Sequence, residues 1–409
     1  MTNRQWFTLH SWAGFAFAGL LLLICATGVL ATASYEIQYL SDEKYRALSD
    51  RNGPVNWAQL EANLVNQYPD SHILGGMVHQ QDYLAGEVRL MTPEGFRFVY
   101  FDAASGTLLG EGGWGQLSRF LRNIHMYLSM GTIGKYIVTL TSLLLIISLV
   151  SSFYVYRKWW RGFLNNPGKL SWKKRIDWSG WHKWMGLWTW WFVALMAITG
   201  LWYLVERMMF DFDVDHYPAS PTVQHSELEQ SQRALPITEL VAKAQAARPD
   251  MDITGFYYPH RHNQPMSLVG QSDSILVRDR ANRVYLDPIT GEVVATQYAA
   301  DLDLLARIVD TADPLHFGNF SGLWLKLVYV VFGLMLTALV AGGMRMHYLR
   351  TQQRDPNVAK WLGITGSFSI AISVAALVYT SMVFDQYSNS STSLSPQLGE
   401  LREQNTPSQ

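Results

Sequence analysis

Four histidines are the residues of this chain best suited to chemistry, because they stand in a pattern that occurs twice. His10 and His182 are each followed by a tryptophan, a glycine and then a Thr-Gly pair at the same spacings. His125 and His316 are each followed by a glycine six residues later and by a lysine ten residues later. A haem without a covalent attachment is held by axial ligands such as imidazole. The pattern therefore predicts histidine-ligated haem b, with two such groups in the chain.

The same repeat predicts which histidines face each other. Equivalent side chains of a duplicated unit approach a shared axis from opposite sides, so that one iron receives two imidazoles. We expect His10 to pair with His182, and His125 to pair with His316, as axial ligands of haem iron. Ionisable groups inside a bilayer are costly and are therefore functional candidates by default. The alternative for any single histidine is a boundary residue that bonds a lipid headgroup or a loop carbonyl.

Other repeated residues fit around a haem or have simpler roles. Gly14 and Gly186 lie one helical turn beyond their histidines, where they leave room for a porphyrin edge or serve helix packing alone. Lys135, Lys326 and Arg122 are candidates to pair with haem propionates. The alternative for the two lysines is that they mark the ends of apolar segments and extend toward lipid headgroups.

The remaining histidines and the cysteine carry weaker signals. Because Cys25 is the single cysteine, the chain holds no internal disulfide, no cysteine-ligated iron–sulfur cluster and no C-x-x-C-H haem attachment. His347 has no counterpart in the first repeat and is interpreted as a residue at the membrane boundary. His260 and His262 could bind a metal or a substrate, but two imidazoles without placed carboxylates are a weak signal. A solvated loop is the simpler interpretation of that pair.

Long apolar segments predict that the chain crosses a membrane several times. A net charge of -1 over 409 residues argues against a nucleic-acid binder. Five stretches reach the ~20 apolar residues that a bilayer requires, and they run approximately over 12–33, 136–155, 184–205, 323–343 and 362–384. We expect an α-helical integral membrane protein with five spans, built on an internally duplicated two-helix unit.

Basic loops predict the orientation of these spans. The segments 157–183 and 345–360 are rich in Lys and Arg, which are retained on the cytoplasmic side. This places the N-terminus inside and both large polar regions outside the bacterial inner membrane. Arg4, the first apolar stretch and the Ala31-Thr32-Ala33 sequence also resemble a cleavable secretory signal. The reappearance of the histidine pattern at the third span, where no signal peptide could lie, argues against cleavage.

The predicted organisation alternates membrane helices with external domains. It comprises a first transmembrane helix (1–35), a first external domain (36–119), a second transmembrane helix (120–158), a basic cytoplasmic loop (159–180), a third transmembrane helix (181–206), a second external domain (207–312), a fourth transmembrane helix (313–350), a fifth transmembrane helix (361–385) and a polar external tail (386–409).

The two external regions share a hairpin signature after a helical opening. The segment 99–102 leads through Gly106 to a second short apolar run, and the segment 284–287 does the same through Gly291. An apolar strand, a turn that starts at Asp and a glycine that supplies positive φ predict a β-hairpin in each region. We therefore expect two small extracytoplasmic α+β domains.

The hairpin with its preceding helix resembles a PepSY domain. The flanking H-x-W-x-G and T-G helices are similar to those of the PepSY-associated transmembrane helix family, and the resemblance covers residues from about 6 to 350. Members of that family include inner-membrane reductases of ferric siderophores that carry two b-type haems, and other members are uncharacterised. The resemblance implies redox work with iron more firmly than any particular substrate.

These observations predict transmembrane electron transfer that reduces an extracytoplasmic ferric chelate, such as a ferric siderophore, and releases Fe(II). No acid–base catalytic residue is required. Because the chain has no G-x-G-x-x-G fingerprint for a nucleotide cofactor, a separate electron donor is expected, either a quinol or a cytoplasmic reductase. Two alternatives remain: a haem-free PepSY sensor or peptidase-regulating membrane protein, and a haem-carrying, quinone-linked subunit that reduces no iron itself.

Helix length raises one difficulty for this interpretation. From His125 to Arg157 is 32 residues, which is ~48 Å of continuous helix. Two haem layers so far apart would transfer electrons inefficiently. Helix tilt, helix breaks at Gly131, Gly134 and Gly318, or the width of the haem ring itself would have to shorten the gap. If none does, an intermediate carrier is needed or one of the two pairs is wrong.

Overall fold

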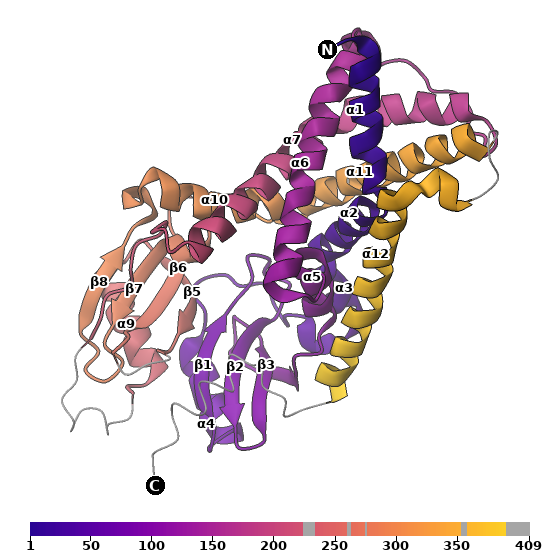
Figure 1. The fold of residues 1–409 in the computed structure, drawn as a ribbon. Helices are drawn as coiled ribbons and strands as arrows, with labels where there is room; N and C mark the ends of the chain where they lie inside the picture. Colours follow the sequence, from indigo (N-terminus) through magenta and orange to yellow (C-terminus); the bar gives the residue numbers. More distant parts are fainter. Residues whose placement is uncertain (224–233, 260–262, 275, 353–357, 390–409) are drawn as a thin grey trace. The chain divides into compact units, whose positions relative to one another are not determined.

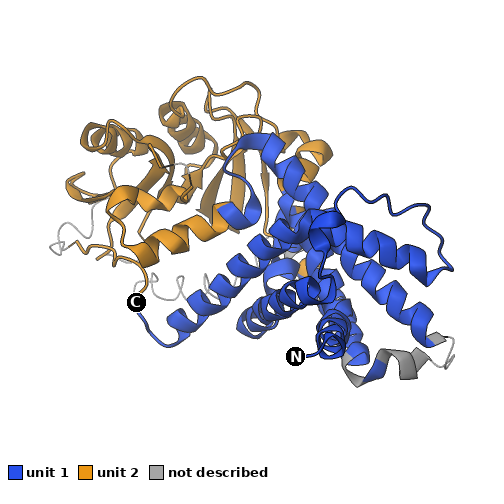
Figure 2. Cartoon of the chain, turned by 90° about the horizontal axis from the view of Figure 1, so that it is seen from above, with its two compact units in different colours: residues 1–34, 118–214, 315–383 blue, residues 35–117, 215–314, 384–409 orange. Residues whose placement is uncertain are grey.

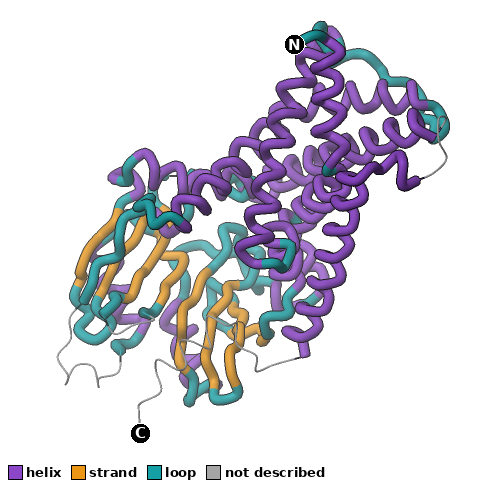
Figure 3. The backbone as a smooth tube through the Cα atoms, in the orientation of Figure 1, coloured by secondary structure: helices purple, strands orange, loops and turns teal. Residues whose placement is uncertain are grey.

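The chain folds into two compact units, which Figure 2 colours separately. The computed structural model describes residues 1–223, 234–259, 263–274, 276–352 and 358–389. The helical unit consists of residues 1–34, 118–214 and 315–383, and the sheet unit of residues 35–117, 215–314 and 384–409. The strands among the described residues, orange in Figure 3, all lie within the residue ranges of the sheet unit. Each unit is thus assembled from segments that are far apart in the sequence.

The helical unit contains the apolar segments. Its helices are α1 (Asn3–Ala16), α2 (Ala18–Thr32), α5 (Leu117–Tyr127), α6 (Gly131–Val155), α7 (Arg175–Asp211), α11 (Gly322–Gln352) and α12 (Val358–Asn389), together with the end of α10 (Leu304–Phe317) (Figure 1). Among the described residues, four helices are long and apolar enough to cross a membrane, and the bent pair α1–α2 would be a fifth span. These are the five apolar stretches that the sequence predicts.

The first span is broken at Phe17, where α1 and α2 meet at an angle of 64°. A break in lipid frees backbone amides that must find another partner. Close to the break, the backbone N–H of Leu20 donates to the hydroxyl of Ser369 on α12 over 2.8 Å. A Cβ at Gly19 would lie 2.9 Å from the side chain of Ile370, so α12 approaches α2 closely at this point. The fifth span therefore supplies a partner for the broken first span.

The second and fourth predicted transmembrane helices, 120–158 and 313–350, are each divided in two, although the apolar stretches 136–155 and 323–343 stay whole. Between α5 and α6 the backbone turns through positive φ at Leu128, Ser129 and Gly131, and between α10 and α11 it does so at Gly318 and Gly322. These turns end the short helices α5 and α10 and start the long helices α6 and α11. The helix from His125 to the basic loop is therefore not continuous, and breaks lie at Gly131 and Gly318, two of the three glycines expected from the sequence as possible break points.

The sheet unit contains one antiparallel sheet of eight strands in the order β4-β3-β2-β1-β5-β6-β7-β8. The strands are β1 (His72–Met77), β2 (Gly86–Thr92), β3 (Gly95–Phe101), β4 (Leu108–Gly112), β5 (Asp252–Tyr257), β6 (Met266–Gln271), β7 (Asn282–Leu286) and β8 (Val293–Gln297). β1 and β5 pair directly, with Gly76 opposite Phe256. The regions 36–119 and 207–312, which the sequence predicts as two separate domains, therefore share one sheet.

Close backbone approach explains how the two halves of the sheet can join. A Cβ at Gly75 of β1 would lie only 2.7 Å from the carbonyl oxygen of Phe256 on β5. The helices α4 (Trp57–Gln67) and α9 (Ile237–Ala247) contact each other and bury Leu60, Leu64 and Leu240 in one hydrophobic core with residues of both sheet halves. The shared core makes the sheet unit a single body.

Both predicted hairpins are confirmed. β3 pairs with β4 and β7 pairs with β8, each across a turn that begins at an aspartate. Gly106 donates its N–H to the carbonyl of Asp102, and Gly291 donates to that of Asp287. Both glycines have positive φ, 72° and 69°, as the turn requires.

Candidate functional site

His10 and His182 face each other within the helical unit. His10 lies on α1 and His182 on α7. Their ring centroids are 6.3 Å apart, and the ring planes cross at 77°. We call these two residues the first pair. Helices from the two halves of the chain bring it together.

His125 and His316 form a second pair in the same unit. Their ring centroids are 6.2 Å apart, with ring planes inclined by 37°. His125 stands near the end of α5 and His316 near the end of α10, so the helix breaks follow both histidines closely. Tyr203 of α7 packs edge-on against His316 at 5.3 Å. Both histidines of this pair thus lie within two residues of the end of a short helix.

The two spacings fit a metal ion held between the rings. An ion bonded at about 2 Å to one nitrogen of each ring, on the line between the ring centres, would separate the centroids by about 6.2 Å, since each nitrogen lies about 1.1 Å from its ring centre. The observed separations are 6.3 Å and 6.2 Å. Both separations match the value for two imidazoles on one ion.

Hydrogen bonds fix the protonation of the first pair. The Nδ1 of His10 lies 3.0 Å from the carbonyl oxygen of Ser148 and 3.1 Å from the hydroxyl of Ser151, both on α6. The Nδ1 of His182 lies 3.1 Å from the carbonyl oxygen of Leu339 on α11. A carbonyl only accepts, so each Nδ1 carries the proton and each Nε2 keeps its lone pair.

The second pair has the same arrangement with different partners. The Nδ1 of His125 lies 3.0 Å from the carbonyl oxygen of Ile24 on α2. The Nδ1 of His316 lies 2.7 Å from the hydroxyl oxygen of Thr199 on α7. Histidines that ligate metals almost always donate their other ring N–H to a carbonyl, a carboxylate or water. Three of the four imidazoles therefore have the carbonyl partner expected of nitrogen ligands, and His316 has the Thr199 hydroxyl in its place.

The acceptors themselves stand at matching positions of the two halves. Ser148 follows His125 by 23 residues, and Leu339 follows His316 by the same 23 residues. Sequence reasoning did not assign these acceptors, because a backbone carbonyl leaves no trace in residue type. The role of Thr199 could have been inferred, since the Thr-Gly pair belongs to the repeated pattern.

A comparison with protein families agrees with these features. Residues 7–350 match the family described as the PepSY-associated TM region. The chain belongs to this family. The matched segment includes all four paired histidines, and it confirms the resemblance inferred from the hairpins and the H-x-W-x-G helices. A search of curated proteins found no match.

In this PepSY-associated chain, the distance between the two pairs can be derived from the length of α7 that separates them. His182 belongs to the first pair and Thr199 contacts the second, and the 17 residues between them on one unbroken helix span about 25 Å. This replaces the ~48 Å expected from a continuous second span. Midway, Phe192 packs against Tyr329 at 5.4 Å and against Phe332 at 6.1 Å. Aromatic rings therefore lie in the protein between the two pairs.

The three cations expected to bind propionates lie on the helices around the second pair. The guanidinium of Arg122, on α5, lies 5.0 Å from the ring centre of Phe317, the residue after His316. The ammonium of Lys135, on α6, lies 6.0 Å from the ring centre of Tyr127. Lys326, on α11, is buried. Their pairing with a propionate remains a prediction.

Room and unused donors also lie on the helices that carry the first pair. A Cβ at Gly14 would meet no atom within 4 Å. The indole nitrogens of Trp178 and Trp202 are buried without a hydrogen-bond partner among the described residues. Trp178 lies one turn before His182 on α7, and Trp202 directly precedes the Tyr203 that contacts the second pair. Sequence reasoning missed both indoles, and both could donate to an acidic group such as a propionate.

The other histidines are engaged elsewhere or lie outside the described residues. His347 stacks on Phe15 with ring centroids 3.5 Å apart, and Arg350 lies 3.2 Å from its Nδ1. His260 and His262 lie outside the described part of the chain. Within the described part, no group of three or more His, Cys, Asp or Glu side chains could hold a metal ion. The candidate site is therefore the two histidine pairs.

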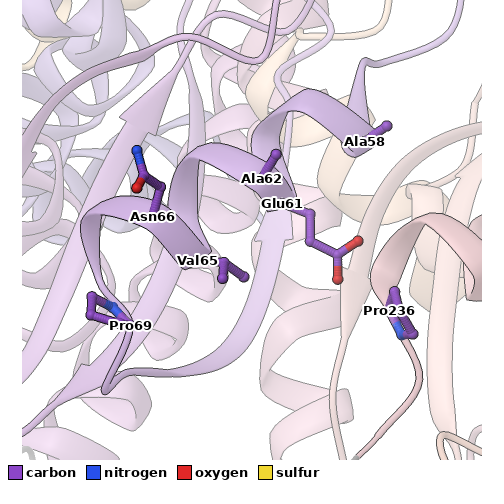
Figure 4. Close-up of a pocket in the computed structure, with 7 residues that line it drawn as sticks. All are labelled: Ala58, Glu61, Ala62, Val65, Asn66, Pro69 and Pro236. Atoms are coloured by element: carbon purple, nitrogen blue, oxygen red, sulfur yellow. The ribbon is translucent and has the colours of Figure 1, made fainter.

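A groove in the sheet unit has a different character. Figure 4 shows its lining, which consists of Ala58, Glu61, Ala62, Val65, Asn66, Pro69 and Pro236. The carboxylate of Glu61 accepts hydrogen bonds from the backbone N–H groups of Ile237 and Thr238 and from the Thr238 hydroxyl. Glu61 therefore stabilises the start of α9, and its carboxylate has this structural role in the groove.

Proposed function

We propose that this protein holds two haem b groups, one between His10 and His182 and one between His125 and His316. It uses them to carry electrons across the membrane to an extracytoplasmic ferric chelate, most simply a ferric siderophore, and so releases Fe(II). In this role it is an oxidoreductase acting on metal ions.

The observation that carries this proposal is the geometry of the two pairs. Both have the ring separation of two imidazoles on one metal ion, and all four Nδ1 atoms are within 3.1 Å of an acceptor. A histidine that merely bonds a headgroup needs no second imidazole opposite it. Two such pairs in one unit favour a pair of bis-histidine cofactors over four unrelated boundary residues.

Haem groups held by these four histidines would supply single-electron transfer, and with both imidazoles of a pair used as ligands no place at the iron would be left for substrate. The protein's own part is to keep the four imidazoles neutral, oriented and close together. The carbonyls of Ile24, Ser148 and Leu339 and the hydroxyl of Thr199 do this by accepting from Nδ1. The ferric chelate would therefore receive its electron at the edge of the protein and not at an iron ligand position.

Iron chemistry supports a chelate as substrate. Fe(II) is a softer and less charged ion than Fe(III), so hard oxygen chelators hold it more weakly after reduction. The basic segment 157–183 supports an orientation with the N-terminus in the cytoplasm and the sheet unit outside the inner membrane. Electrons would come from a separate donor, a quinol or a cytoplasmic reductase.

The first test is an optical spectrum of the purified protein. We expect Soret and α bands of low-spin haem b on reduction, with two haems per chain. Changing His10, His125, His182 or His316 to Ala should lower the haem content or alter coordination in each case. His347→Ala is the matched control, because this histidine has other partners in the same unit, and it should keep both haems.

An Ala variant could lose haem because it misfolds, so a variant that replaces one iron ligand by another is a further test. His125→Met should keep a haem whose reduction potential is raised, because thioether ligation favours the reduced iron. A wild-type protein without haem bands would overturn the proposal. Two unchanged six-coordinate haems in any one of the four Ala variants would remove that histidine from the ligand set.

The second test concerns the substrate. The protein is reduced with dithionite, and its reoxidation is followed after addition of a ferric siderophore or of ferric citrate, with an Fe(II)-specific chelator as reporter. Fast reoxidation with Fe(II) release supports a reductase. Haem that reoxidises with neither compound would point instead to a haem-carrying subunit that passes electrons to another protein.

A further inference from the structure

Thr199 makes a hydrogen bond that specifies the state of one histidine. Its hydroxyl donates to the carbonyl oxygen of Leu195, one turn earlier on α7, over 2.8 Å. The same hydroxyl oxygen lies 2.7 Å from the Nδ1 of His316. A hydroxyl has one proton, and we assign it to the helix carbonyl, the same kind of contact that Thr27 makes in the first half of the chain. Toward His316 the oxygen can therefore only accept, so Nδ1 carries a proton and Nε2 does not.

The equivalent threonine in the first half of the chain does not do this. Thr27 also donates to a carbonyl one turn earlier, that of Leu23, over 2.7 Å. Its hydroxyl oxygen, however, is 3.5 Å from the Nδ1 of His125, which lies 3.0 Å from the carbonyl oxygen of Ile24. At 3.5 Å a hydroxyl contributes little beside a carbonyl at 3.0 Å. The two threonines share a sequence position but not a role.

We propose that Thr199 is a positioning residue for the second pair and tunes the haem that His316 ligates, an inference that rests on the proposed function. Its hydroxyl holds the imidazole in the tautomer that ligates through Nε2, and by accepting from Nδ1 it makes the ring a stronger electron donor to iron. The hydrogen bond to His316 can be tested by mutation because its acceptor is a side chain. The backbone carbonyls that accept from the other three histidines cannot be replaced in this way.

Three variants separate this role from packing. Thr199→Val keeps the shape and removes the acceptor, Thr199→Ser keeps the acceptor, and Thr27→Val is the matched control on α2. In the full-length protein, the midpoint potentials of both haems are measured by spectroelectrochemical titration, and haem loss is measured by transfer to apomyoglobin. Thermal unfolding of each variant reports on the fold.

Thr199→Val should raise the midpoint potential of one haem, because its imidazole becomes a weaker donor. It should also speed haem loss from one site about 10- to 100-fold, the usual effect of removing a partner of a ligating histidine. Thr199→Ser should restore wild-type values, and Thr27→Val should leave both haems unchanged.

Two results would overturn the inference. One is a Thr199→Val protein whose two potentials and haem-loss rates equal those of the wild type. The other is an equal shift in Thr27→Val, which would make the effect a matter of packing. Failure of the proposed function looks different, because the wild-type protein itself would then lack haem bands.

Discussion

The imidazole of His125 rests directly on Gly28 of α2. A Cβ at Gly28 would lie 2.8 Å from the Cε1 atom of His125, closer than side chains approach each other. The ring also lies within hydrogen-bonding distance of the carbonyl of Ile24, one turn earlier on the same helix. Gly28 therefore allows the imidazole to lie flat enough on α2 to reach that carbonyl, which explains a glycine of the repeated Thr-Gly pattern.

Gly28→Ala should therefore disturb one haem site and spare the other. The added methyl pushes His125 away from α2 and lengthens its bond to Ile24, and losing such a partner costs about tenfold or more in cofactor affinity. The haem content of the purified variant should fall from two toward one per chain.

Gly200→Ala is the matched control for this change, because Gly200 has the same place in the Thr-Gly pair of α7. A Cβ there would meet the Cβ of Ser142 at 3.1 Å and no histidine within 4 Å. Equal haem loss in both variants would show that the loss comes from disturbed helix packing and not from a displaced imidazole.

A substitution at Gly14 can distinguish two roles that the sequence leaves open for this residue. Its missing side chain could serve helix packing or make room for a porphyrin. In the structure no atom lies within 4 Å of the position of a Cβ at Gly14, so Ala would be tolerated by the protein itself. Ala in a helix interior is favoured over Gly by about 0.5–1 kcal/mol.

We therefore expect Gly14→Ala to leave the thermal unfolding of the haem-free protein unchanged or slightly improved, while the haem occupancy of the first pair falls. Haem content and unfolding temperature are measured on the same preparations. Unchanged haem content with unchanged stability would mean that the open space beside Gly14 holds no part of the cofactor.

The histidine pairing could be predicted from sequence, and the helix breaks that accompany it only in part. The repeat relates His125 to His316 through spacing alone, and the structure brings them to 6.2 Å. The turn after His125, however, uses Leu128 and Ser129 at positive φ, a conformation that sequence rules reserve for Gly and Asn. Gly131 and Gly318 mark the places where the sequence allows a break, but the residue types at Leu128 and Ser129 give no warning that the first turn starts there.

The joined sheet is a second feature that local sequence could not reveal. Each half shows its own hairpin, and both hairpins were predicted from an aspartate and a glycine at fixed spacing. The pairing of β1 with β5 depends instead on two strands far apart in the chain and on glycines that permit close approach at Gly75 and Gly76. Long-range strand pairing leaves little local pattern.

The carboxylate of Asp310 anchors α10, the helix that also carries His316 of the second pair. It is fully buried on α10 and accepts from Arg278 over 3.0 Å, from Arg280 over 2.8 Å and from Tyr217 over 2.5 Å. Removing one partner of a buried ion pair costs 3–5 kcal/mol. The two arginine side chains are 26% and 36% exposed, so water offsets part of that cost.

Asp310→Asn should therefore lower the free energy of unfolding of the sheet unit by about 3 kcal/mol, the lower end of that range. The measurement is denaturant unfolding of the intact protein. Asp313→Asn serves as control, because this carboxylate pairs with Arg278 but is 28% exposed, and its cost should stay below about 1 kcal/mol. A loss of less than about 1 kcal/mol in Asp310→Asn would contradict the assignment.

The lowered pKa of the Asp102 carboxyl predicts how the stability of the sheet unit depends on pH. Burial alone would raise the pKa of this carboxyl, but hydrogen bonds from the hydroxyl and backbone N–H of Ser105 and from the backbone N–H groups of Leu48 and Ser49 outweigh it and hold the pKa below its ordinary value. A carboxyl whose pKa is lowered on folding stabilises the folded state above the unfolded pKa of about 3.9. That contribution is lost as the pH falls through the folded-state pKa.

Asp102→Asn should thus destabilise the protein near neutral pH, because the amide NH2 would face N–H donors on one side of the turn. The difference in unfolding free energy between wild type and variant should be constant from pH 7 to about pH 5 and shrink toward pH 3. Unfolding curves of both proteins across this range measure it. A difference that stays the same down to pH 3 would show that the charge on Asp102, as distinct from its shape, contributes nothing to the turn.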